Sequence, residues 1–271
     1  MSVSRTFLAL SIVAALLAAV TSLAGILGSD AYARETPAWA VQAVGQDCAN
    51  LLVAGVLSWS VVLLRRDRVL PLFVWLGCLL YLIYAFAIYA FAVHFNRWFL
   101  AYVAVLGTSF YAMAGTLVNL DLERTTAPLR EHPHRRGAGL LLILIGVMFS
   151  LLWLSEIVPH ALSARVPATL VETGLWTNPV HVLDLAFLLP GMIMVGVLGR
   201  RQHPWGLVLL VPMLVFSATM GIGILAFFAL SARRDFPVAL PAAAIVGIVV
   251  LASVLYVALL LAAPVRSAGR G

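Results

Sequence analysis

Stretches of about 20 apolar residues follow one another along the whole chain. A helix of that length crosses the hydrocarbon core of a bilayer, because each residue adds 1.5 Å to a core about 30 Å thick. We therefore predict an all-α, polytopic membrane helix bundle, with residues 1–271 forming a single transmembrane domain. The eight predicted spans cover residues 6–28, 47–65, 69–93, 98–119, 138–158, 179–199, 204–230 and 237–263.

Composition excludes several other classes of protein. Apolar residues make up 63% of the chain and charged residues 10%, against roughly a half and a quarter in soluble domains, so a water-soluble fold is excluded. The net charge of +6 does not indicate nucleic-acid binding, because the arginines lie in short runs between spans. The chain contains no lysine, which excludes a retinal Schiff base.

The arginines also predict topology. With a cytoplasmic N-terminus, the inner segments carry twelve arginines and the outer segments five. The positive-inside rule then places both termini in the cytoplasm of a multi-pass protein of the bacterial plasma (inner) membrane. Residues 1–33 also resemble a signal peptide ending at Ala33, but the apolar run from Phe7 to Leu27 is longer than usual for one and favours a retained span.

The inner loop 120–137 divides the spans into two sets of four. Asn50 lies 15 residues before Arg65 in span 2, and Asp184 lies 16 residues before Arg200 in span 6. A parallel 4+4 repeat is one interpretation of this likeness. The other is that basic inner turns and similar span lengths are general properties of membrane proteins.

Ionisable residues gather near the predicted outer ends of the spans. Asp184 lies about 7 Å inside span 6, and Glu156 lies at a similar depth in span 5. Carboxylates at such depth face protein or water and have a partner, and His181, one turn from Asp184, is the predicted one. Asn178 shares the same helix face.

Other residues complete a predicted outward-facing polar pocket between spans 2, 3, 5 and 6. Asp47 and Asn50 open span 2, although a position of Asp47 in the wet headgroups is an alternative. The deeper Tyr84 is a candidate partner for Asp184. Pro190 and Gly191 interrupt span 6 and form a candidate hinge.

The same polar groups also suggest a metal site. The candidate ligands are His94, His160, His181 and Asp184, although no pair has a recognised metal-binding spacing. No cofactor is predicted. Cys48 and Cys78 lie at different depths, so we expect two unpaired thiols in the core.

Three segments resemble a family of bacterial integral membrane proteins of uncharacterised activity. They are SEIVP at 155–159, TNPVHVLDLAFLLP at 177–190 and YAFAVHFN at 89–96. The resemblance covers residues 46–206 and implies a bacterial membrane protein, with no activity, cofactor or site residues attached to it.

Three function classes stay open. The leading hypothesis is a pocket that binds or transports a small solute or cation, with Asp184 and Glu156 as charged groups and His181 as a titratable partner. The first alternative is a metal-dependent intramembrane enzyme, and the second is a non-catalytic membrane subunit with a structural polar cluster. The predicted partners are the lipid bilayer and the solute, with no nucleic acid.

Overall fold

The computed structural model describes residues 3–28, 30–64, 70–234, 236 and 238–262, and all regular elements in this part of the chain are helical. Eight spans are long and apolar enough to cross a membrane, so the predicted number is confirmed. Seven are continuous or nearly so: α1 (Arg5–Leu27), α2 (Pro37–Leu64), α3 (Leu70–Ala92), α4 (Phe99–Val118), α6 (Arg135–Leu162), α10 (Pro204–Arg233) and α11 (Leu240–Leu261). The remaining span is composite and consists of α8 (Pro179–Leu183), the π-helical turn η1 (Asp184–Leu188) and α9 (Leu189–Arg200).

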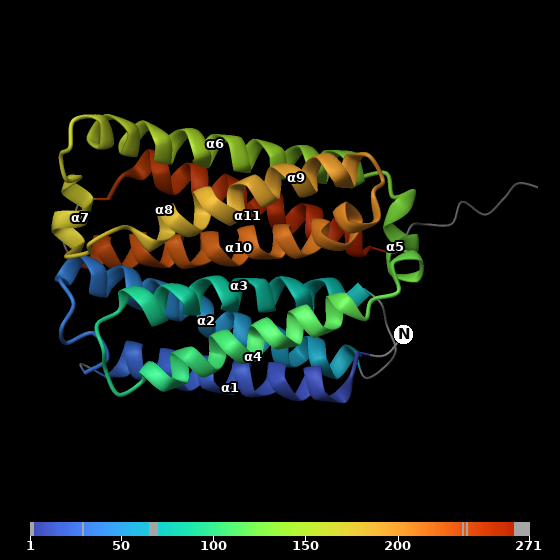
Figure 1. Cartoon of the computed structure of the whole chain (residues 1–271), viewed down its shortest axis with the longest axis horizontal. Coiled ribbons are helices and arrows are strands. Elements are labelled where there is room, and N and C mark those ends of the chain that lie inside the picture. The colour runs from blue at the N-terminus through green and yellow to red at the C-terminus, as the bar shows by residue number, and fades with distance from the viewer. Residues whose placement is uncertain (1–2, 29, 65–69, 235, 237, 263–271) are drawn as a thin grey trace, which may run out of the picture.

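The spans form two adjoining groups of four (Figure 1). In the first, α1 packs against α2 and α4, and α3 packs against the same two helices. In the second, α9 lies between α6 and α10, and α11 packs on α10. Helix α10 joins the groups because it also packs against α2 and α3.

Two short helices mark the ends of the bundle. Helix α7 (Ala168–Thr173) lies at one end, and α5 (Leu122–Arg130) lies at the other, together with the N-terminal end of α1 (Figure 1). We call these the α7 end and the α5 end.

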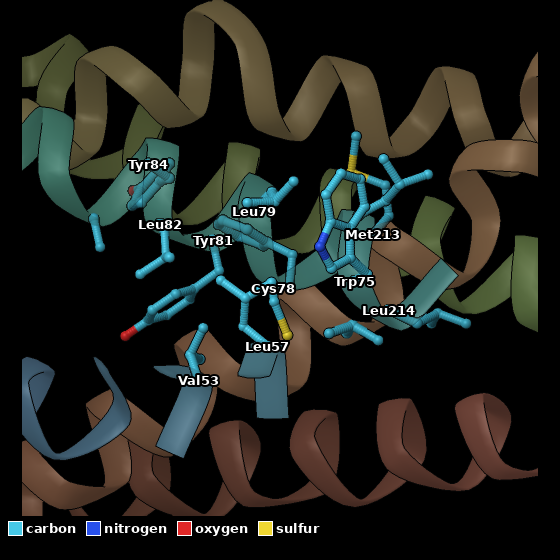
Figure 2. Packing of buried hydrophobic residues seen from close by; sticks show 14 of the residues in the cluster. Val53, Leu57, Trp75, Cys78, Leu79, Tyr81, Leu82, Tyr84, Met213 and Leu214 are labelled. Atoms are coloured by element: carbon cyan, nitrogen blue, oxygen red, sulfur yellow. The ribbon is translucent and has the colours of Figure 1, made fainter. Parts of the chain in front are cut away.

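The core lies where α3 and α10 meet (Figure 2). Lipid tails are as apolar as leucine, so close packing replaces the hydrophobic effect as the force between membrane helices. Gly77 allows this approach, because a Cβ atom there would lie 2.6 Å from Val215 Cβ and 3.0 Å from the Pro212 carbonyl oxygen. Trp75, Tyr81 and their neighbours fill the remaining space.

The start of the second span was predicted too late. Helix α2 begins at Pro37, ten residues before the predicted start at residue 47, so Asp47 lies about 15 Å along the helix. Asp47 is 1% exposed and Asn50 is completely buried. The alternative that places Asp47 in the wet headgroups was therefore wrong.

Both cysteines are unpaired, as predicted, but only Cys78 is a core residue. Cys48 is exposed, so its predicted place in the core was wrong. It follows Asp47 directly, and successive helical residues point about 100° apart, so the rotation that buries Asp47 turns Cys48 outward.

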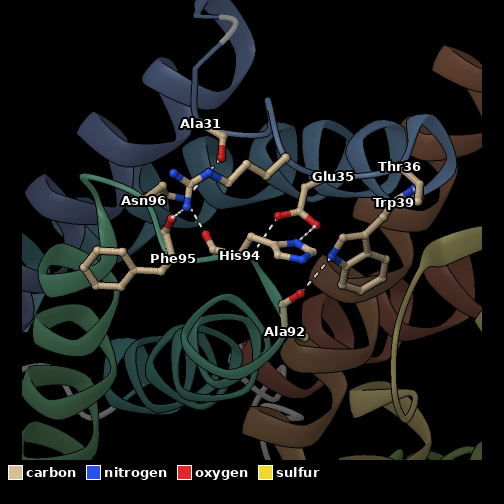
Figure 3. Close-up of polar contacts among 9 residues, drawn as sticks. Ala31, Glu35, Thr36, Trp39, Ala92, His94, Phe95 and Asn96 are labelled. Atoms are coloured by element: carbon tan, nitrogen blue, oxygen red, sulfur yellow. Dashed lines mark hydrogen bonds and ion pairs between the residues drawn. The ribbon is translucent and has the colours of Figure 1, made fainter.

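A set of polar contacts joins the first two loops at the α7 end (Figure 3). The Glu35 carboxylate accepts a 2.7 Å hydrogen bond from the backbone N–H of His94 and lies 3.0 Å from its Nδ1. The Trp39 indole donates to the Ala92 carbonyl over 3.1 Å, and Asn96 donates to the Ala31 carbonyl over 3.1 Å. These contacts hold the start of α2 against the end of α3.

Candidate functional site: a cavity with one carboxylate

A cavity of about 350 Å³ lies among α2, α3, α6, α10, α11 and the composite span. Its wall is mainly apolar, and eight aromatic side chains contribute to it: Trp39, Tyr84, Tyr89, Phe149, Trp153, Phe216, Phe227 and Phe228. Polar groups come from Gln42, Gln46, Asn178, Asp184 and Ser217. Among the described residues that line the cavity, Asp184 alone has a carboxylate, and none has a cationic side chain.

Asp184 is 6% exposed and is held by donors from two other spans. The Tyr84 hydroxyl donates to Oδ1 over 2.8 Å, and the Trp153 indole N–H donates to Oδ2 over 2.8 Å. This confirms the prediction that the acidic face of span 6 meets partners on other spans, and it confirms Tyr84 as one of them.

The predicted pairing of Asp184 with His181 was wrong. The Trp153 indole takes the place next to Asp184 and packs its ring against the imidazole, with 4.7 Å between the ring centroids. His181 is directed instead to Glu156, with 4.0 Å between Nε2 and Oε2. Neither of these two residues lines the cavity.

Asp184 opens a widened helical turn. The Leu189 N–H bonds to the Asp184 carbonyl, five residues back instead of four. Pro190 follows immediately and has no N–H of its own to continue the regular pattern. Such π-helical turns are common at functional sites, and this one lies beside the candidate hinge at Pro190 and Gly191.

Glu156 belongs to the rim of the α7 end. It accepts a 2.7 Å hydrogen bond from the Thr169 hydroxyl of α7, so it ties α6 to the segment that follows. His160 Nδ1 lies 2.7 Å from the Glu156 carbonyl oxygen. Asn178 both lines the cavity and caps α8, accepting from the Val180 N–H over 2.9 Å.

A second polar network surrounds Asp47. Tyr32 donates to Asp47 Oδ2 over 2.6 Å, and Tyr89 donates to Oδ1 over 2.9 Å. Asn50 donates to Ser22 over 3.0 Å. We define the Asp47 cluster as Ser22, Tyr32, Gln46, Asp47, Asn50, Tyr81 and Tyr89.

The cluster extends to the cavity. Tyr81 donates to Asn50 Oδ1 over 2.9 Å and accepts a hydrogen bond from Gln46. Gln46 and Tyr89 line the cavity, whereas Asp47 and Asn50 lie behind them. The predicted pocket residues therefore divide among three places. Asp184, Asn178 and Tyr84 line the cavity, Asp47 and Asn50 belong to the Asp47 cluster, and Glu156 and His181 lie outside both.

The candidate metal ligands do not converge. His94 pairs with Glu35, while His160, His181 and Asp184 have the separate partners described above. Within the described ranges, no group of three or more histidine, cysteine, aspartate or glutamate residues is placed to hold a metal ion.

Sequence reasoning missed Trp153, Tyr32 and Gln46. Trp153 lies one turn before Glu156, a spacing that places both on one helix face and could have indicated the indole as a partner. Tyr32 lies in a loop, and no helical spacing connects it to Asp47.

Comparisons with family models, with curated proteins and with solved structures gave no match.

Proposed function

We propose that this protein binds a small organic cation with an apolar body in the cavity at Asp184 and moves it across a bacterial plasma membrane. The observation that carries the proposal is the wall of the cavity, which combines one carboxylate with eight aromatic side chains. Aromatic faces attract ammonium groups electrostatically and also pack against apolar surface. A neutral ligand would leave the carboxylate without a counter-charge, and a strongly hydrated inorganic cation would make little use of the aromatic wall.

The partners of Asp184 support its role as the negative charge. An indole N–H can only donate, so Trp153 fixes Oδ2 as an acceptor. Tyr84 satisfies one acceptor position on Oδ1, and a carboxylate has about four in all. The remaining positions are available to a cationic ligand, and buried acids in membranes typically mark such pathways.

The proposed orientation follows from the arginines. In the described part of the chain, the α5 end carries Arg5, Arg124, Arg130, Arg135, Arg136, Arg200 and Arg201. The α7 end carries Arg34, Arg97, Arg165, Arg233 and Arg234. The positive-inside rule then places the α5 end and both termini in the cytoplasm, and it makes the α7 end external.

The arrangement of the spans also supports a duplicated four-span unit. In each group the first span packs on the second, the second on the third and the third on the fourth. The second span carries a buried aspartate in both groups. We include a parallel 4+4 repeat in the proposal on these grounds.

Binding can be tested with two probes of the same shape, benzyltrimethylammonium and its uncharged carbon analogue neopentylbenzene. Trp39 and Trp153 line the cavity, so quenching of tryptophan fluorescence in detergent reports occupancy. We expect the cation to bind the native protein at least tenfold more tightly than the analogue. Asp184→Asn should reduce this preference, since the attraction between the two charges is lost while the attraction of the cation to the aromatic faces remains.

Glu172→Gln is the matched control, because Glu172 is an exposed carboxylate of α7 at the same end of the bundle. It should leave both affinities unchanged. Transport is then measured as uptake of the labelled cation into proteoliposomes. Equal affinity for the two probes in the native protein would refute the proposal.

A further inference from the structure

Asp47 is a buried carboxylate surrounded by neutral groups. The ionisable side chains around it are Tyr32 from the loop, Cys48 of α2, Tyr81 and Tyr89 of α3 and Tyr102 of α4. Within the described residues, no arginine or histidine forms an ion pair with it. A buried charge without a counter-charge is costly, and such a group reduces the cost by taking up a proton.

The Tyr89 hydroxyl provides hydrogen bonding for both forms of Asp47. Its single proton lies within reach of two acceptors, Asp47 Oδ1 at 2.9 Å and the Ala43 carbonyl oxygen at 3.1 Å. When Asp47 is ionised, the hydroxyl donates to the carboxylate. When Asp47 is protonated, the hydroxyl can turn to Ala43 and accept from the carboxyl group, so neither form leaves a buried group unpaired.

Asp184 differs on this point. One of its two donors is the Trp153 indole, which has no lone pair with which to accept a hydrogen bond in return. The two tyrosine hydroxyl groups that contact Asp47, at 2.6 and 2.9 Å, both can, and the Asn50 amide, which cannot, is a longer contact at 3.5 Å. A proton on Asp184 would therefore have to lie on Oδ1 and be donated to Tyr84, whose hydroxyl has no second acceptor among the described contacts, whereas the Tyr89 hydroxyl has the Ala43 carbonyl. The hydrogen-bond partners thus favour the anion at Asp184 and allow a reversible proton at Asp47.

The surroundings of Asp47 favour a proton over a metal ion. Helix α1 packs so closely that a Cβ atom on Gly25 would collide with Asp47 Oδ2. Tyr32 and Tyr89 cover the two carboxylate oxygens from the other sides. Tyr89 also lines the cavity, so it connects the carboxylate to the space that a solute or water would occupy.

We propose that Asp47 is a proton-binding site that exchanges protons with the cavity through the Tyr89 hydroxyl. In uptake, a hydronium ion in the cavity gives a proton to the Tyr89 oxygen while the phenolic proton passes to Asp47 Oδ1. Water stays in the cavity, Tyr89 is again neutral, and Asp47 has gained one proton. Release reverses these transfers, and neither direction requires a particular solute.

The test is infrared difference spectroscopy of the purified full chain across a pH titration. A protonated carboxyl gives a carbonyl band that an ionised carboxylate lacks, and exposed carboxyl groups are protonated only below about pH 4. We expect a titrating band that Asp47→Asn abolishes and Asp184→Asn retains. This result would not depend on whether the cavity binds cations, so the two proposals can fail separately.

Two phenylalanine variants test the route. After a rapid pH jump, Tyr89→Phe should slow the appearance of the band at least tenfold. Tyr32→Phe is the matched control: it also removes a phenol from Asp47, but Tyr32 does not line the cavity, so the rate should not change. Equal slowing in both variants would overturn the route.

A titration without a band that depends on Asp47 would overturn the site. If Asp47→Asn does not fold, the Asp184→Asn protein with isotope-labelled aspartate replaces it. Of the described aspartates, Asp30 and Asp121 are exposed, so Asp47 is then the only buried one. A labelled band that titrates supports the proposal, and its absence refutes it.

Discussion

The hydrogen bond between Tyr84 and Asp184 can be measured directly by a double-mutant cycle. Tyr84→Phe removes the phenolic donor and leaves Oδ1 of a buried carboxylate without its 2.8 Å partner. Hydrogen bonds to charged groups contribute about 1.5 to 3 kcal/mol, so we expect the free energy of unfolding to fall by about that amount. The assay is reversible unfolding in mixed micelles, followed by circular dichroism.

The second side of the cycle is Asp184→Asn, which preserves shape and removes charge. Its amide oxygen can accept from Trp153, and its NH2 group can donate to the Tyr84 oxygen, so both contacts survive as neutral hydrogen bonds. Tyr84→Phe should therefore cost less in the Asp184→Asn background. Interhelical pairs in a membrane protein have coupling energies that average about 0.6 and reach about 1.7 kcal/mol, and we expect a value in the upper half of that range.

The exposed Tyr111, 66% accessible on α4, provides the control for the cycle. Tyr111→Phe should change the unfolding free energy by less than about 0.5 kcal/mol. A coupling energy within about 0.3 kcal/mol of zero between positions 84 and 184 would refute the contact that defines the site.

Three further predictions concern the fold. Gly139→Ala should destabilise the protein by about 1 to 3 kcal/mol in the same unfolding assay, because the new Cβ would lie 2.7 Å from the Gly196 carbonyl oxygen. Gly107→Ala is the control: a Cβ there meets open space, so the change should be neutral or stabilising. Burial lowers the pKa of His132, which lies outside the spans, so the folded protein binds a proton there less readily than the unfolded chain. Thermal stability should therefore fall as the pH drops below about 6.5, and it should fall less in His132→Asn. N-ethylmaleimide should modify the exposed Cys48 in detergent while the buried Cys78 stays unmodified until the protein unfolds, as mass spectrometry can show.

The number of spans could be predicted because length and hydropathy are local properties of the sequence. The start of α2 could not be located, because Gln42, Gln46 and Asp47 made residues 37–46 read as a polar loop. In the structure these side chains face the cavity and the Asp47 cluster, so the helix continues through them. Because these polar residues lie in the outer turns of α2, the sequence pattern located neither the start of the helix nor the depth of Asp47 within it.

The partners of Asp184 show a second limit. A spacing of three residues correctly placed Asp184 and His181 near one another on the same helix, but it says nothing about the side chains of other spans. Tyr84 lies 100 residues away along the chain and Trp153 lies 31 residues away. Contacts over such separations depend on the rotation of each helix, which the apolar pattern leaves undetermined when the lipid-facing and core-facing sides are equally apolar.

The two buried aspartates provide complementary functions if both proposals hold. A proton on Asp184 would leave the Tyr84 hydroxyl without an acceptor, so the anion is favoured there and can attract a cation. Asp47 is held by hydroxyl groups that can reverse, so its charge can be removed by a proton from the same cavity. Because the two carboxylates share that cavity through Tyr84 and Tyr89, protonation of Asp47 would reduce the negative potential around a bound cation. Cation affinity should therefore be higher when Asp47 is ionised, and Asp47→Asn should make that affinity independent of pH without abolishing it, whereas Asp184→Asn should weaken it at every pH.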